Sequence, residues 1–347
     1  MKEARVLFVH NGLTSFIKID KEILSTNYKV EELGHSRKYL VNPFKVWSAV
    51  SRNDLVFAWF ASWHSLLPVI FASLMGKPSL LVTGGYDTAN IPEAQYGNQR
   101  LWWKRFITNF ILRRATHLIC NSYFTLNEAM EAAKLDISKF TVLYHGIPDR
   151  YKESRPKSKM ALNVGNVLEE NLKRKGIVPF LEAGALVPGY RFVQVGAWKD
   201  QSYLRLQALL SENVEMKGYA AESELNEYYL QSKVYVQPSL HEGFGMSVVE
   251  AMQAGCIPLV SGHGALPEVV REYGIILEHT APEFIAKGIE EAENFRYTPE
   301  QIREFALSRY AISSREQGLI ECIKELLPNK EAKAGNRHLN GHASKGF

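Results

Sequence analysis

Two glutamates set around a pair of glycines mark the segment best suited to chemistry. Positions 237–255 read QPSLHEGFGMSVVEAMQAG, in which Glu242 directly precedes Gly243 and Gly245, and Glu250 follows in a predicted helix. Glycines ahead of a helix N-terminus let backbone N–H groups approach an anion closely. Two carboxylates would repel a phosphate, so we expect them to accept hydrogen bonds from sugar hydroxyls. A plain helix start with incidental glutamates explains the pattern equally well.

The elements that must position these residues alternate along the chain. Short apolar runs, which predict strands, are separated by longer amphipathic runs, which predict helices. This alternation indicates parallel sheets built from βαβ units. Positions 148–159 are charged and contain two prolines, so they predict a linker between two doubly wound α/β domains. Such sheets bind ligands outside the carboxyl ends of their strands. The strands are predicted over Val6–His10, Lys29–Leu33, Leu55–Phe60, Ser79–Thr83, His117–Asn121, Thr141–Tyr144, Met160–Val164, Arg191–Val195, Val214–Met216, Val234–Gln237, Ile257–Val260 and Ile275–Leu277.

The composition is that of a globular protein. The chain has 347 residues, enough for roughly two domains, and 46% hydrophobic with 22% charged residues exclude extended disorder for most of it. A net charge of +4 is too small to indicate nucleic-acid binding. The three cysteines form no C-x-x-C pair and are interpreted as core residues in a reducing compartment. The N-terminus has no apolar signal core, which favours a cytoplasmic protein.

One long uncharged segment raises the question of a membrane span. Positions 55–76 contain no Asp, Glu, Lys or Arg, and a run of this length can cross a bilayer. The segment also contains His64 and Pro68, and it follows Asp54 as a strand follows a turn. We therefore predict a buried strand followed by a buried helix.

The segment around the two glutamates resembles a family signature. The spacing of Glu242 and Glu250 is similar to the E-x7-E signature of retaining glycosyltransferases of family 4, and the flanking PS, EAMQAGCIPLVS and GALPEVV fit the same context. HNGLTS, CNSYFT, YHGIPDRY and VQVG extend the resemblance from Arg5 to about Leu327, most strongly over 237–270. The resemblance implies a GT-B fold, with two Rossmann-like parallel-sheet domains facing a central cleft.

The resemblance also implies what each part of the chain does. Residues 1–150 are expected to form the acceptor-side domain, and residues 160–310 the domain that holds a nucleotide diphosphate sugar. Residues 311–328 are expected to form a closing C-terminal helix, and the polar tail over 329–347 is expected to be disordered. The implied activity is transfer of a hexose-type sugar, with retention of anomeric configuration, to a hydroxyl group of a glycan or lipid-linked acceptor.

The signature assigns roles to individual residues by resemblance. Glu242 is expected to contact the donor sugar, Glu250 the ribose hydroxyls, and Lys175 the diphosphate. Base recognition relies on backbone at 217–219, which leaves UDP-, GDP- and ADP-sugars open as donors. Gly12 leaves room for a ligand near the first strand, although a tight turn explains it as well. The other expected donor-binding residues are Gly218, Tyr219, Gly243, Phe244, Gly245 and Met246.

Two positions depart from the family pattern. Asn166 stands where the family has an arginine, so Arg174 beside Lys175 is a candidate substitute; a solvated helix start explains this basic run as well. Asp87 stands where the family commonly has a histidine near the reacting carbon. Asp87 is therefore a candidate catalytic residue together with Lys175 and Glu242, although an Asp that only closes a turn is the plainer interpretation.

Further expectations concern cofactors and surfaces. The sequence has no Asp or His cluster suited to a metal, so we expect no metal ligand and no required cofactor. Arg100–Arg114, RLWWKRFITNFILRR, combines five basic residues with two tryptophans and no acid. This pattern is typical of a helix on an anionic membrane surface, which would make the protein peripheral on the cytoplasmic face. A core-packed helix with solvated cations explains it as well.

Two other functions stay open. A GT-B relative that hydrolyses or epimerises nucleotide sugars would need no acceptor. A non-catalytic subunit that binds a nucleotide sugar would show no turnover, and the departures at Asn166 and Asp87 favour that alternative.

Overall fold

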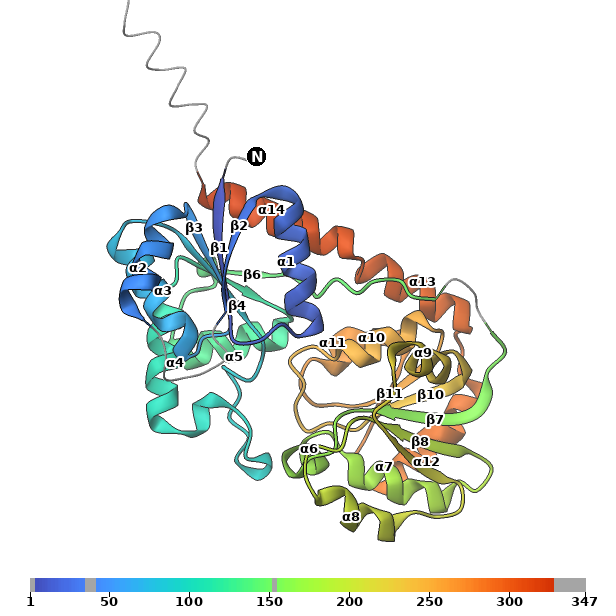
Figure 1. Cartoon of the computed structure of the whole chain (residues 1–347). Helices are drawn as coiled ribbons and strands as arrows, with labels where there is room; N and C mark the ends of the chain where they lie inside the picture. The colour runs from blue at the N-terminus through green and yellow to red at the C-terminus, as the bar shows by residue number, and fades with distance from the viewer. Residues whose placement is uncertain (1–3, 35–41, 152–154, 328–347) are drawn as a thin grey trace, which may run out of the picture.

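Two parallel six-stranded β-sheets form the two halves of the molecule (Figure 1). The structure is a computed structural model that describes residues 4–34, 42–151 and 155–327. The first sheet contains β1 (Arg5–His10), β2 (Lys29–Gly34), β3 (Leu55–Trp59), β4 (Ser79–Thr83), β5 (His117–Cys120) and β6 (Phe140–Val142). The second contains β7 (Ser158–Val164), β8 (Arg191–Val195), β9 (Val214–Gly218), β10 (Ser232–Gln237), β11 (Ile257–Ser261) and β12 (Ile275–Leu277).

Both sheets are doubly wound, as the sequence predicts. The first has the order β2-β1-β3-β4-β5-β6 and the second the order β12-β11-β10-β7-β8-β9. All the predicted strands are present, and each observed end lies within two residues of its predicted position. The strand order reverses between β1 and β3 in the first sheet and between β7 and β10 in the second. These two reversals define where ligands are expected to bind.

Helices cover both faces of each sheet. The uncharged segment forms β3 and then α3, as predicted. Within the described ranges, none of the helices combines the length and the apolar character that a bilayer span requires. The helices of the first half are α1 (Ser15–Asn27), α2 (Pro43–Arg52), α3 (Trp63–Leu74), α4 (Trp102–Arg114) and α5 (Tyr123–Ala133). Those that follow are α6 (Glu169–Arg174), α7 (Ile177–Ala183), α8 (Ser202–Leu206), α9 (Glu222–Gln231), α10 (Met246–Gln253), α11 (Leu266–Val270), α12 (Pro282–Glu291), α13 (Pro299–Arg309) and α14 (Ile312–Leu326).

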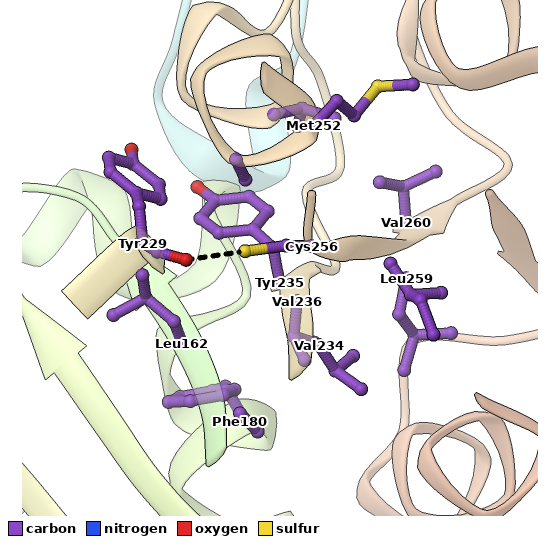
Figure 2. Close-up of a cluster of buried hydrophobic side chains, with 14 of the residues drawn as sticks. Leu162, Phe180, Tyr229, Val234, Tyr235, Val236, Met252, Cys256, Leu259 and Val260 are labelled. Atoms are coloured by element: carbon purple, nitrogen blue, oxygen red, sulfur yellow. Dashed lines mark hydrogen bonds between the residues drawn. The ribbon is translucent and has the colours of Figure 1, made fainter. Parts of the chain in front are cut away.

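The cores lie between sheets and helices. Every residue of β3 and β4 is buried, as expected for central parallel strands covered on both faces. Figure 2 shows part of the second core, where Cys256 lies among apolar side chains and its thiol donates to the Tyr229 carbonyl oxygen at 3.0 Å. All three cysteines are buried and unpaired, in agreement with their interpretation as core residues.

The last described helix returns to the first half of the molecule. In Figure 1, α13 lies over the second half, whereas α14 runs beside α1. Arg315 of α14 donates to both carboxylate oxygens of Asp20 in α1, at 3.0 and 2.8 Å, and each of these side chains is only 1% exposed. The tail predicted over 329–347 lies outside the described residues.

Candidate active site

The loops after β7 and β10 meet at the carboxyl edge of the second sheet, where the strand order reverses. They form one wall of a cleft of about 610 Å³, and the first half of the molecule supplies the opposite wall. We call this cavity the interdomain cleft. Its lining includes Phe16, Trp59, Gly84, Tyr96, Asn121 and His145 from the first half and Asn166, Arg174, Lys175, Glu242, Phe244, Met246 and Glu250 from the second.

Two glycines shape the loop that precedes α10. Gly245 has a φ of +99°, and a Cβ atom there would lie 2.8 Å from Cδ2 of Leu266. A Cβ atom on Gly243 would lie 3.0 Å from the carbonyl oxygen of Gly84 in the first half. The loop can therefore pass close to both walls, and Met246 in the first turn of α10 lines the cleft. The first backbone N–H groups of a helix have no partner within it and are suited to bind an anion.

Glu242 is a half-buried carboxylate that contacts two cations. Its Oε1 lies 3.2 Å from Nζ of Lys175 and 3.5 Å from Nη1 of Arg174. Burial by itself would raise the pKa of Glu242, but the two cations outweigh burial and hold the pKa below its ordinary value. The side chain is therefore an ionised hydrogen-bond acceptor at neutral pH.

Lys175 reaches the cleft because a glycine leaves room for its stem. A Cβ atom on Gly165 would lie only 2.9 Å from Cδ of Lys175. Sequence reasoning missed Gly165, although its place at the end of a predicted strand, next to Asn166, was a usable signal. Asn166 also lines the cleft, and its side-chain oxygen accepts the backbone N–H of Ala197 at 3.2 Å.

Arg174 is part of the wall of the cleft. It is 8% exposed, donates to Oδ1 of Asn171 at 2.7 Å, and lies 4.5 Å from the ring centroid of Tyr96 in the first half. The interpretation of the basic run as a solvated helix start is wrong. The run lies at the end of α6, where cations are favoured by the helix dipole, and of its side chains only Lys173 is largely exposed.

Glu250 faces the same cleft from α10. Its Oε1 lies 3.4 Å from Nη1 of Arg150, and the hydroxyl group of Tyr229 donates to its Oε2 at 3.2 Å. Burial raises the pKa of Glu250, and Arg150 opposes that rise. Arg150 belongs to the segment that joins the two halves, and its Nε also lies 3.0 Å from Oε1 of Glu222. Sequence reasoning missed this arginine because nothing local shows which helix it meets.

Residues 217–219, the expected base-recognition segment, lie where β9 ends. Tyr219 lines the cleft and is 78% exposed. Gly218 has a φ of +69°, and a Cβ atom there would lie 3.4 Å from the indole ring of Trp198. The cleft thus has an aromatic, solvent-facing end that is suited to a flat ring.

Asp87 and Gly12 are not among the residues that line the interdomain cleft. Asp87 is 1% exposed, and its carboxylate accepts the backbone N–H groups of Ala61 and Gly84, both at 3.0 Å. Burial raises the pKa of Asp87 in spite of these bonds. Its visible role is to close the turn after β4. Gly12 is exposed, and a Cβ atom there would meet nothing within 4 Å, so the described fold does not require glycine at this position.

A second pocket, of about 690 Å³, lies in the first half at the carboxyl ends of β1, β3 and β4. We call it the first-domain pocket. Asp87 borders this pocket, and Phe16 borders both this pocket and the interdomain cleft. Its wall is mainly apolar and includes Phe60, Trp63, Trp103 and Ile107, with Asn11, Asn98 and Lys104 as polar members.

Direct contacts also join the two halves of the molecule. The carboxylate of Glu268 accepts the backbone N–H of Tyr123 at the start of α5 at 2.9 Å and the hydroxyl group of Tyr144 at 2.8 Å. Nε2 of His241 lies 2.9 Å from Oε1 of Glu128. These contacts connect the two halves beside the cleft, at residues that are not part of its lining.

Two polar residues of the first wall were not singled out by sequence reasoning. His145 and Asn121 both line the cleft, and both are more than nine-tenths buried. They lie in the YHGIPDRY and CNSYFT segments, which served only to extend the family resemblance. The position of His145 beside Phe244 becomes visible only in the folded chain, whereas Asn121 ends the strand predicted over 117–121.

The second half of the chain matches a family model. Residues 149–309 match the one described as Glycosyl transferases group 1. A segment of 119 residues is 29% identical to O-antigen chain mannosyltransferase B of Escherichia coli and covers 30% of each protein. Another of 108 residues is 35% identical to the serotype-specific mannosyltransferase WbdA of Escherichia coli and covers 28% of this chain and 13% of that protein. The match thus spans less than a third of the length of these curated relatives.

The fold is similar to that of solved structures over nearly the whole chain. The Anabaena protein HepE, solved in complex with UDP and glucose, superimposes with a TM-score of 0.73 at 15% identity, over 93% of this chain and 100% of that one. At this identity the likeness concerns the fold alone. It confirms the expectation of a GT-B fold.

Proposed function

We propose that this chain is a retaining glycosyltransferase that moves a hexose-type sugar from a nucleotide diphosphate sugar to a hydroxyl group of a glycan or lipid-linked acceptor. One observation carries the proposal. Lys175, Glu242 and the first turn of α10 converge where the strand order of the second sheet reverses, within a segment that matches Glycosyl transferases group 1. The mannosyltransferase relatives support a hexose as the transferred sugar.

The donor is expected to lie along the second half of the chain. The diphosphate would meet Lys175 and the first amides of α10, which stabilise negative charge that grows as the sugar leaves. Glu242 would accept a hydrogen bond from a hydroxyl group of the sugar and keep the ammonium group of Lys175 in place. Glu250 would accept the ribose hydroxyls, and Tyr219 lies where a base can stack.

The reaction needs little covalent chemistry from the protein. The bond between the anomeric carbon and the phosphate oxygen breaks, and its electron pair stays on the diphosphate. The acceptor oxygen bonds to the anomeric carbon from the same face, and its proton passes to the departing phosphate. The protein contributes positioning and charge stabilisation.

The first-domain pocket is the proposed acceptor site. It shares Phe16 with the interdomain cleft, so an acceptor held there can present a hydroxyl to a donor in the cleft. Its largely apolar wall fits a lipid-linked or otherwise apolar acceptor tail. Asp87, at its border, remains a candidate for orienting the acceptor.

α4 supports an additional proposal that the protein is peripheral on an anionic, cytoplasmic membrane surface. Trp102 and Phe106 are 78% and 71% exposed, and Arg105 and Arg114 are exposed on the same helix. Trp103 of α4 also lines the first-domain pocket, so the helix joins that pocket to the surface. A lipid-linked acceptor could then reach the pocket from the membrane.

A thermal-shift screen against UDP-glucose, UDP-galactose, UDP-N-acetylglucosamine, GDP-mannose and ADP-glucose tests the donor. A donor in large excess over its dissociation constant should raise the melting temperature. The glycosyltransferase proposal expects binding of at least one donor and acceptor-dependent release of the nucleoside diphosphate. Free sugar or an epimer formed without acceptor would indicate a hydrolase or epimerase. Binding without turnover across many acceptors would indicate a non-catalytic subunit.

A further inference from the structure

His145 is held in the wall of the interdomain cleft by aromatic rings. Its imidazole lies parallel to the indole of Trp59, with ring centroids 5.8 Å apart and an interplanar angle of 2°. The rings of Phe16 and Phe244 lie 5.3 and 5.1 Å away, from opposite halves of the molecule. This packing fixes the plane of the imidazole and leaves only its edge available to a ligand.

The two ring nitrogens of His145 are unusual for a buried polar side chain because, within the described part of the chain, both lack a hydrogen-bond partner. His145 is 7% exposed, yet neither ring nitrogen has a hydrogen-bond partner among the described residues. Burial, reinforced by the positive charge of Arg315, holds the pKa of His145 well below its ordinary value. A neutral imidazole has one donor and one acceptor nitrogen, and both can pair with hydroxyl groups. Buried polar groups are normally paired, so unpaired nitrogens at the wall of a cleft point to a ligand.

Arg315 fixes the backbone that positions the imidazole of His145 in the cleft wall. Its guanidinium donates to the carbonyl oxygens of Leu143 and Tyr144, at 2.6 and 3.4 Å, directly before His145. The same guanidinium is anchored on buried Asp20. The backbone that carries His145 is thus fastened from behind by α14, and the side chain is presented to the cleft.

Asn121 provides an independent observation on the same wall. Its amide nitrogen donates to the carbonyl oxygen of Thr83 at 2.8 Å, whereas its side-chain oxygen is buried and has no partner among the described residues. Asn121 also lines the interdomain cleft. The first half therefore offers unsatisfied polar atoms from two separate segments, after β5 and after β6, to one cavity.

We propose that His145 binds a hydroxyl group of the donor's hexose, with Asn121 as a second acceptor on the same wall. This inference rests on the proposed function and adds the residues that select the sugar from the first half of the molecule. The donor is favoured over the acceptor because His145 packs on Phe244, two residues from Glu242, and lines only the interdomain cleft and not the first-domain pocket. A site built to pair a hydroxyl discriminates strongly against a sugar that lacks it.

The test compares His145→Phe with the wild-type protein. Phe can keep the stacking on Trp59 and the edge-on contact with Phe244, and it removes both nitrogens. The probe is whichever of the five sugar nucleotides named above is turned over, with its monodeoxy analogues. We expect kcat/KM for that donor to fall about tenfold, in line with the loss of a hydrogen bond. The affinity for the free nucleoside diphosphate should be unchanged, because Glu250 and Lys175 are untouched.

The deoxy series separates recognition from structure. Wild-type protein should lose at least about tenfold in kcat/KM when one particular hydroxyl is removed, and His145→Phe should show no further loss for that analogue. A variant that is merely destabilised would keep the discrimination. If His145→Phe does not fold, His145→Asn and His145→Gln replace single ring nitrogens, and one of them should retain part of the discrimination. His279→Phe, the same change at an exposed site, should leave the donor kinetics and the discrimination unchanged.

Three outcomes would overturn the inference. Unchanged donor kinetics and discrimination in His145→Phe would refute it while leaving the proposed function intact. A rise in the acceptor KM alone, with donor kinetics unchanged, would refute the assignment to the donor sugar. Absence of binding of every sugar nucleotide to the wild-type protein would refute the proposed function together with the inference.

Discussion

The ammonium group of Lys175 lies 3.2 Å from a carboxylate oxygen of Glu242 inside the interdomain cleft. The lysine stem passes over Gly165, so the position of the charge is set by a glycine at one end and a carboxylate at the other. Nη1 of Arg174 lies 3.5 Å from the same carboxylate oxygen. The two neighbouring cations thus have different tasks: Lys175 is partly exposed to the cleft, whereas Arg174 is buried in its wall.

Lys175→Ala should lower kcat by roughly a hundredfold, because it removes one charge aimed at the departing diphosphate. Binding of the ground-state donor should weaken less, since the charge on the leaving group grows in the transition state. Steady-state kinetics with the donor found in the thermal-shift screen measures both effects. Lys173→Ala is the matched control, because Lys173 is exposed on the same helix. Equal effects of the two substitutions would show that Lys175 has no special role.

Arg174→Ala should mainly reduce stability. The substitution removes a buried cation that contacts Glu242, Asn171 and Tyr96, and breaking a buried ion pair from one side costs about 3 kcal/mol. Urea denaturation should show a larger loss for Arg174→Ala than for Lys175→Ala, whose side chain is only partly buried. The opposite order would contradict the assignment of Arg174 to the wall.

The pH dependence of nucleotide binding should report on Glu250. Burial raises the pKa of this carboxyl group while Arg150 opposes the rise, so acidification should protonate it and weaken its bonds to the ribose. Arg150→Gln removes the opposing charge and moves the pKa still higher. Calorimetric titration with UDP or GDP between about pH 5 and 8, a range in which most other carboxyl groups stay ionised, should therefore show the loss of affinity at higher pH in Arg150→Gln than in wild-type protein.

Glu250→Ala completes this test. The substitution should weaken nucleotide binding about tenfold to a hundredfold, as expected for the loss of a hydrogen bond to a charged group. In a Glu250→Ala background, Arg150→Gln should no longer shift the pH at which nucleotide affinity is lost. If Arg150→Gln and wild-type protein titrate at the same pH, Glu250 is not the group that binds the nucleotide.

Membrane association through α4 should depend on salt. Each basic residue near an anionic surface contributes about 1 kcal/mol, and this attraction is screened as ionic strength rises. Replacing Lys104, Arg105, Arg113 and Arg114 with Gln should abolish sedimentation with anionic liposomes at low salt. Lys287→Gln with Lys324→Gln, at exposed sites on other helices, should leave it unchanged. Equal binding to neutral and anionic vesicles would refute an electrostatic origin.

Much of the fold was readable from the sequence because its signals are local. Short apolar runs, separated by longer amphipathic runs, predicted every strand of both sheets. Strand order is not local, yet alternation with helices restricts it to parallel arrangements. The return of α14 to the first half could not be predicted, because the pairing of Arg315 with Asp20 joins residues 295 positions apart.

The candidate site could also be predicted only in part, where its signals are local. Glu242 and Lys175 lie in recognisable segments, and the structure brings them together. Asp87 shows the limit: a carboxylate after two glycines looks the same in sequence whether it faces a substrate or closes a turn, and only burial and the bonds to Ala61 and Gly84 distinguish these roles. The roles of His145 and Arg150 could not be predicted, because their contacts are with residues that are distant in the sequence.

Acceptor-dependent release of nucleoside diphosphate tests the central proposal most directly. The donor from the thermal-shift screen would be incubated, with EDTA present, with octyl glycosides as acceptors and with the corresponding methyl glycosides, whose aglycone is too short for the first-domain pocket. We expect release that requires an acceptor, is faster with octyl than with methyl glycosides, persists without divalent metal, and yields a product whose anomeric configuration by NMR is that of the donor. Release that is independent of acceptor, that needs magnesium or manganese, or that gives the inverted product would contradict this account.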